Sequence, residues 1–170
     1  DDLGAEFFAE LNSERIRVRL LANYGVGFNH IDLASAAQRQ ISVSNTPGVL
    51  TEATADLALT LMLMVARRAG EGERQLRAGQ WQGWRPTHLV GASVTGCTLG
   101  IVGMGRIGQA LARKAQRGLD MQVLYYSRSA LPADSEVQAE RCNSLEALLA
   151  QSDFVSLHCP SNAETRHLLN

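Results

Sequence analysis

A glycine-rich segment in the second half of the chain constrains the fold most strongly. Residues 99–102 are apolar and predict a buried strand of a parallel sheet. Gly103, Gly105 and Gly108 follow in the spacing Gly-x-Gly-x-x-Gly, and apolar residues then recur at helical steps of three and four. In this context the first glycine permits a tight turn, the second admits a pyrophosphate and the third lets the helix pack closely. The segment therefore predicts a dinucleotide site. The alternative is a glycine turn in some other α/β unit, including one that binds a different nucleoside ligand.

Composition narrows the class of protein. A chain of 170 residues holds one domain, or one domain and a piece of another. The net charge of −1 gives no basic surplus for nucleic acid or an acidic membrane surface. The longest apolar run, residues 57–66, is shorter than the roughly 20 residues that span a bilayer. The three cysteines are far apart in the sequence and show no Cys-x-x-Cys spacing, so we expect no metal site and no disulfide framework. The cysteine pattern and the lack of a signal peptide lead us to expect a cytoplasmic location.

The first half of the chain predicts an α/β unit of its own. The pattern predicts, in order, a helix over residues 5–11, a strand over 16–20, a glycine-rich turn over 23–29, a helix over 33–39 and a strand over 41–44. Residues 57–66 are apolar on every side, which predicts a helix buried all round between layers, domains or subunits. A polar helix is expected over 71–78, and no regular structure from 79 through 96.

The segment from residue 98 onward predicts a doubly wound sheet. The helix after the glycines is expected to run to Arg117 and end at Gly118. Further elements are expected as strands over 121–126 and 137–142, a helix over 145–151 capped by Ser144, and a fourth strand with its exit loop over 153–160. The chain ends partway through such a sheet.

Several stretches together resemble the D-isomer-specific 2-hydroxyacid dehydrogenases. The matching stretches are residues 24–32, 45–52, 79–81, 99–108 and 156–160, with 164–170 also similar. The segment with Trp81 and Trp84, together with Tyr126-Ser127-Arg128, is most similar to the glyoxylate/hydroxypyruvate reductase branch.

The resemblance implies a two-domain organisation. Residues 1–47 would end the first segment of a flavodoxin-like substrate-binding domain. Residues 48–170 would form an incomplete Rossmann-type NAD(P)-binding domain with a doubly wound parallel sheet and a dimerisation segment at about 57–96. The family's catalytic arginine, glutamate and histidine come later in the chain. No catalytic residue is therefore expected within these 170 residues, and the chain alone is expected to be inactive.

The resemblance also assigns binding residues. The backbone N–H groups of Val26 and Gly27 would hold a substrate carboxylate, a role that a small concave group of donors suits; a plain strand-to-helix turn is the alternative. Asn29 and Asp32 are typical of helix caps. The positions assigned to the cofactor are Thr54, Gly103, Gly105, Arg106, Ile107, Gly108, Cys159, Pro160 and Thr165. Trp84 would face the partner subunit of a homodimer.

The end of the second strand of the dinucleotide unit indicates the cofactor. In NAD-binding versions of this fold an acidic residue about 20 positions beyond the glycine motif binds the adenosine ribose. Here that position is Ser127, and Arg128 follows it. A guanidinium pairs well with a phosphate, so we expect NADP(H) in preference to NAD(H). A solvated Arg128 and use of either cofactor is the alternative.

The histidines do not point to a catalytic site, and two classes of function are open. His30, His88, His158 and His167 share no spacing with one another or with a carboxylate motif, so we expect structural or surface roles for them. The favoured interpretation is a reductase of small 2-oxo acids that transfers a hydride from a nicotinamide. The alternative is a non-catalytic dinucleotide sensor such as the corepressors of the same fold, because fold does not fix function. Formate dehydrogenases share the fold too, but their polar segment near residues 47–49 is absent.

Overall fold

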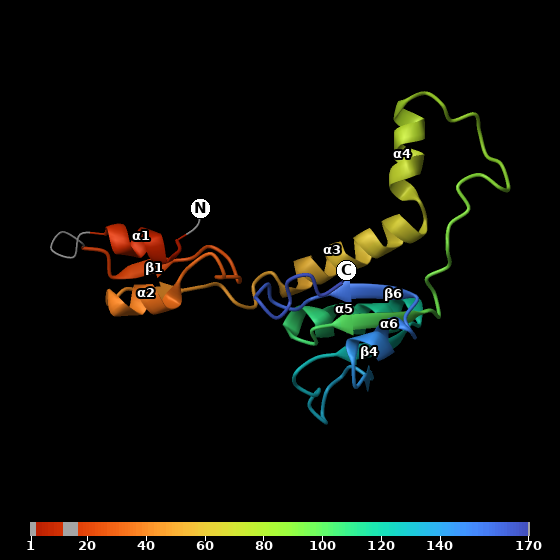
Figure 1. Ribbon diagram of the computed structural model, residues 1–170. Helices are drawn as coiled ribbons and strands as arrows, with labels where there is room; N and C mark the ends of the chain where they lie inside the picture. The colour runs from red at the N-terminus through yellow and green to blue at the C-terminus, as the bar shows by residue number, and fades with distance from the viewer. Residues whose placement is uncertain (1–2, 12–16, 170) are drawn as a thin grey trace. The chain divides into compact units, whose positions relative to one another are not determined.

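The computed structural model describes residues 3–11 and 17–169, which divide into two compact units. One unit comprises Asp1–Leu50 and Pro160–Asn170, and the other comprises Thr51–Cys159 (Figure 1). Each unit has a hydrophobic cluster of its own.

The first unit is a small α/β arrangement. Its elements are α1 (Ala5–Glu10), β1 (Leu20–Ala22), α2 (Leu33–Gln38) and β2 (Ser42–Ser44). The two strands are parallel with Leu21 opposite Val43, and Phe8, Ile31, Ala36 and Ile41 form the buried cluster. The expected helices and the second strand are confirmed to within a residue. The strand expected over 16–20 is wrong for residues 17–19, because pairing with the short β2 begins only at Leu20; Ile16 lies outside the described residues.

The second unit is built on a parallel four-stranded sheet. Its elements are α3 (Thr51–Ala66), α4 (Ala69–Arg77), β3 (Thr98–Val102), α5 (Arg106–Leu119), β4 (Gln122–Tyr126), β5 (Glu140–Arg141), α6 (Leu145–Leu149) and β6 (Phe154–Leu157). The strand order is β5-β4-β3-β6, so the chain moves outward from β3 on one side and then returns to its other side. This reversal of direction is the topological switch point of a doubly wound fold.

Helices cover both faces of this sheet. Leu99 and Ile101 of β3 are fully buried in the cluster that includes Leu111 of α5. Gly100 lies between them and faces α6, where an added Cβ would come within 2.6 Å of the Leu148 side chain. The alternation of side chains along a strand thus places α5 and α6 on opposite faces.

Helix α3 packs on α5 through one face only (Figure 1). Ala55 and Ala66 are buried, and Lys114 of α5 pairs with Glu52 at 2.7 Å and with Asp56 at 2.8 Å. An exposed row remains, formed by Leu57, Leu61, Met64 and Val65. The described residues of this chain therefore leave this row open, and its burial against another domain or subunit, which the sequence expectation included, stays a prediction.

Several element boundaries differ from those expected. Helix α5 continues past Gly118 to Leu119, because Leu119 packs against the core and Asp120 takes the left-handed conformation that ends the helix. Strand β5 has two residues rather than six, and α6 ends at Leu149. The Ser144 cap is confirmed, as is the lack of helix and strand from 79 through 96. Within the described part of the chain, no helix has the length and apolar character needed to cross a membrane.

Candidate functional site

Three parallel strands of the second unit, β3, β4 and β6, end side by side at the carboxyl edge of the sheet. Val102 is opposite both Tyr126 and Leu157. The ladder continues one step further, since the Gly103 N–H donates to the Tyr126 carbonyl at 2.9 Å and the His158 N–H to the Val102 carbonyl at 2.7 Å. The predicted glycine loop, Ser127 and His158 therefore follow neighbouring strands at the edge where doubly wound folds bind ligands.

The glycine loop forms a close-packed backbone cradle. Gly103 has a φ of +95°, and a Cβ there would lie 2.6 Å from the Cys159 nitrogen. A Cβ on Gly108 would collide with the Gly103 carbonyl oxygen. At Gly105 a Cβ would meet nothing within 4 Å, so this position borders open space. The first and third glycines shape the loop, and the second keeps the space beside it clear.

The start of α5 presents unpaired donors to that space. Among the described residues, no acceptor pairs with the backbone N–H groups of residues 104–108; the next N–H, of Gln109, donates to the Gly105 carbonyl at 2.9 Å. The dipole of a 14-residue helix adds positive potential at this end. The Arg106 side chain is exposed and that of Ile107 half-buried. The cradle and its donors fit a pyrophosphate.

The turn after β4 is braced at both ends. Arg141 Nη2 on β5 donates to the Ser127 carbonyl at 2.9 Å and to the Arg128 carbonyl at 3.0 Å. The Leu131 N–H donates to the buried Tyr125 hydroxyl at 3.0 Å. Arg128 is exposed and Ser127 is half-buried. Sequence reasoning missed Arg141 and the Tyr125 hydroxyl; the available signal was the position of Arg141 near the end of an expected strand.

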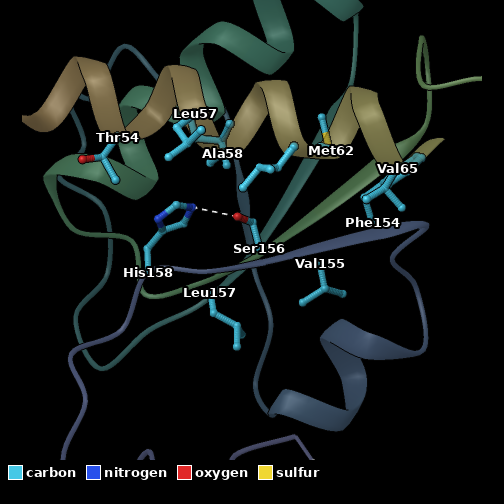
Figure 2. Close-up of a pocket in the computed structure, with 12 residues that line it drawn as sticks. Thr54, Leu57, Ala58, Met62, Val65, Phe154, Val155, Ser156, Leu157 and His158 are labelled. Atoms are coloured by element: carbon cyan, nitrogen blue, oxygen red, sulfur yellow. Dashed lines mark hydrogen bonds between the residues drawn. The ribbon is translucent and has the colours of Figure 1, made fainter. Parts of the chain in front are cut away.

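An apolar hollow of about 470 Å³ lies between α3 and β6 (Figure 2). Thr54 and His158 both line it, and Figure 2 shows Ser156 and His158 pointing toward α3 while Val155 and Leu157 point away. His158 Nε2 lies 2.9 Å from Ser156 Oγ, and burial lowers the pKa of His158 from 6.5. The imidazole is therefore neutral near pH 7, and its structural role stays a prediction. Among the other histidines, His88 Nε2 lies 2.7 Å from Gln75 Oε1.

The turn with Val26 and Gly27 lies in the first unit. The Asn23 side-chain amide donates to the Gly25 and Gly27 carbonyls at 3.1 and 2.9 Å, and Asn45 donates to the Val26 carbonyl at 3.0 Å. These bonds occupy the carbonyls. The Val26 and Gly27 N–H groups have no acceptor among residues 3–11 and 17–169. Such a pair of free donors can hold a carboxylate.

Other predicted positions have more modest surroundings. The Thr165 hydroxyl donates to the Pro160 carbonyl at 2.6 Å and accepts from the Asn162 N–H at 2.9 Å, so it shapes the loop after Pro160. Trp84 is 82% exposed. Asp32 caps α2 by accepting from the Ser35 N–H at 2.9 Å, whereas Asn29 is not the cap residue.

Sheet order, glycine cradle and free helix donors together define the second unit as a Rossmann-type dinucleotide-binding unit. Residues 59–170 match the family model described as D-isomer specific 2-hydroxyacid dehydrogenase, NAD binding domain. The chain therefore belongs to the D-isomer specific 2-hydroxyacid dehydrogenase family, and a nicotinamide dinucleotide is the cofactor of this domain.

Curated relatives and solved structures agree with this family. The chain is 48% identical over 165 residues to a glyoxylate reductase of Thermococcus litoralis, covering 94% of this chain and 49% of the relative. It is 45% identical over 155 residues to a glycerate dehydrogenase of Hyphomicrobium methylovorum, covering 90% and 48%. The crystal structure of a glyoxylate reductase from Paecilomyes thermophila superposes with a TM-score of 0.85 at 37% identity, covering 99% and 49%. The chain spans about half the length of the curated relatives it matches.

Proposed function

We propose that the protein is an NAD(P)-dependent oxidoreductase that interconverts small 2-oxo and 2-hydroxy acids, with glyoxylate and hydroxypyruvate as substrates. The observation that carries the substrate class is the pair of free N–H groups at Val26 and Gly27, since a 2-oxo acid offers a carboxylate beside its reactive carbonyl. Relatives named glyoxylate reductase and glycerate dehydrogenase support the same chemistry. They lend no support to a non-catalytic sensor.

The residues of this chain bind and orient in the proposed reaction. The Val26–Gly27 turn fixes the carboxylate, and Asn23 and Asn45 hold that turn by its carbonyls. The cradle at Gly103–Gly108 and the α5 donors hold the pyrophosphate, with Thr54, Cys159, Pro160 and Thr165 assigned to the remainder of the cofactor. When bound, the nicotinamide supplies the hydride that the oxo carbon accepts. The catalytic arginine, glutamate and histidine of the family are assigned outside these 170 residues, and inactivity of the chain alone stays a prediction.

The proposed cofactor is NADP(H) in preference to NAD(H). Ser127 stands where an acidic side chain would accept the ribose hydroxyls, so no carboxylate repels a 2′-phosphate there. Arg128 is exposed and lies in none of the ion pairs among the described residues, which leaves its guanidinium available to a phosphate.

We also propose a homodimer joined through roughly residues 57–96, from the apolar part of α3 to the segment before β3. The exposed apolar row on α3 and the exposed Trp81 and Trp84 support it, because large apolar side chains that gather on exposed surface mark interfaces. Trp84 would then face the partner. A cytoplasmic location stays a prediction.

The activity is tested by following NADPH absorbance in the full-length protein with glyoxylate or hydroxypyruvate. We expect turnover, and we expect Gly27→Asp to raise KM for the oxo acid by about tenfold or more through charge repulsion, with little change in KM for NADPH. Gly27→Asn is the matched neutral control and should affect KM much less. Cofactor binding without turnover of any small 2-oxo acid would overturn the proposal.

A further inference from the structure

Arg141 lies beside the turn on which the proposed cofactor preference depends, near the end of a strand that the sequence predicts. We propose that Arg141 is a positioning residue for the adenosine 2′-phosphate of NADP(H): it holds the Ser127–Arg128 turn in the form in which Arg128 meets the phosphate. This inference rests on the proposed preference for NADP(H).

The backbone of Arg141 is fixed next to β4. Arg141 is opposite Tyr125 in the parallel ladder, and the N–H of the next residue, Cys142, donates to the Tyr125 carbonyl at 2.8 Å. From this anchored position, Nη2 reaches the carbonyls of Ser127 and Arg128 together. One guanidinium nitrogen thereby ties two successive peptide groups of an exposed turn to the sheet. The Tyr125 hydroxyl holds the far end of the same loop at Leu131.

The charges around the Ser127–Arg128 turn favour the binding of a dianionic phosphate. Neither Arg128 nor Arg141 lies in an ion pair within residues 3–11 and 17–169, so no carboxylate there neutralises them. Glu140 is adjacent in sequence, but successive side chains on a strand point to opposite faces. The two carbonyl oxygens would repel a phosphate, and donation from a cation offsets this repulsion. NAD(H) carries no 2′-phosphate, so it gains little from the arrangement.

The test is a double-mutant cycle in the full-length protein, with equilibrium titration of NADPH and of NADH into each variant. Arg128→Ala should weaken NADPH binding by roughly ten- to a hundredfold, as expected for a lost charge-assisted bond. Arg141→Ala should weaken it by about five- to tenfold and change NADH affinity by less than about twofold. Because Arg141 acts through the turn that carries Arg128, its effect should shrink markedly in the Arg128→Ala background.

Three further variants separate positioning from general stability. Arg141→Lys keeps a cation that can donate to the carbonyls and should restore most of the NADPH affinity, whereas Arg141→Met should not. Arg117→Ala removes another exposed arginine of the same unit, which pairs with Glu136 at 3.3 Å, and should leave both affinities unchanged.

Each outcome decides between distinct ideas. A selective loss in Arg128→Ala with none in Arg141→Ala overturns the role of Arg141 and leaves the NADP(H) preference standing. No selective loss in Arg128→Ala overturns that preference and, with it, the inference. Equal losses of NADH and NADPH affinity in Arg141→Ala would show that Arg141 does not position Arg128. The same would follow if the fold loss of NADPH affinity in the double variant equalled the product of the losses in the two single variants.

Discussion

The backbone nitrogen of Cys159 lies 2.6 Å from the point that a Cβ on Gly103 would occupy. The loop after β3 and the loop after β6 thus pack backbone against backbone at the sheet edge. Gly103 also has a φ of +95°, a backbone conformation that residues other than glycine rarely adopt. Both constraints act on one residue.

Gly103→Ala should therefore lower the free energy of unfolding by about 2–4 kcal/mol, from backbone strain and the forced movement of the second loop. The urea unfolding midpoint measures this change. Gly118→Ala is the matched control: Gly118 lies inside α5 with nothing within 4 Å of an added Cβ, so alanine should stabilise by up to about 1 kcal/mol. Equal stability of the two variants would contradict the structure of the loop.

Gly105→Ala separates binding from folding. The added methyl group enters open space at a φ of −80°, so the unfolding midpoint should not change. The same methyl group would stand where the pyrophosphate approaches the backbone, so affinity for NADH and NADPH should fall together by about tenfold, or about 1.4 kcal/mol. Calorimetric titration of each cofactor checks this, and unchanged affinity would mean that the phosphates bind elsewhere.

Ser127→Asp should reverse the proposed preference for NADP(H). The new carboxylate would repel the 2′-phosphate and accept from the ribose hydroxyls, so NADPH affinity should fall by more than about tenfold while NADH affinity holds or rises. Ser127→Asn supplies a neutral side chain of similar size and should change the ratio much less. If Ser127→Asp and Ser127→Asn changed the ratio of NADPH to NADH affinity equally, a charge effect at this position would be ruled out.

Val65→Glu should break the proposed dimer. Val65 is 77% exposed in the apolar row of α3, and a buried carboxylate without a partner opposes association. Light scattering at micromolar concentration should show a dimer for the native protein and a monomer for the variant. Val49 is 81% exposed in the first unit, so Val49→Glu should leave the dimer intact. A native protein that is monomeric would refute the interface.

His158→Gln should change how stability depends on pH. Burial lowers the pKa of His158 from 6.5, so below pH 6.5 the unfolded chain binds a proton that the folded chain does not. The free energy of unfolding should therefore decrease as the pH is lowered from 6.5. The decrease should be smaller in the variant, whose amide can still form a hydrogen bond with Ser156. Denaturant titrations between pH 7 and pH 5 measure the difference, and parallel curves for both proteins would contradict it.

The sequence predicted best what local rules determine. The strand, glycine turn and helix at 98–119 follow from residues adjacent in the chain, and the structure confirms that architecture. The environment of α3 could not be predicted in the same way. Because α3 is apolar on every side, its sequence does not show which of its faces packs on α5. The length of β5 depends on how much of β4 its backbone can reach, which a propensity pattern does not contain.

The site shows the same division. Gly103 and Gly108 were identifiable because their spacing reflects a local turn. Arg141 was not, because it acts on carbonyls 13 and 14 residues earlier in the chain through a contact between neighbouring strands. The Asn23 and Asn45 amides, which occupy the carbonyls of the Val26–Gly27 turn, were missed because the partners of an amide side chain follow from the fold.

The groups assigned to cofactor choice lie outside the hydrophobic core of the second unit. Ser127, Arg128 and Arg141 are exposed or half-buried, and none belongs to the buried cluster. Substitutions confined to their side chains should therefore leave the packing of β3, β4 and α5 intact. Descendants of one ancestral protein could therefore exchange one nicotinamide cofactor for the other through a few surface changes, with no compensating change in the interior.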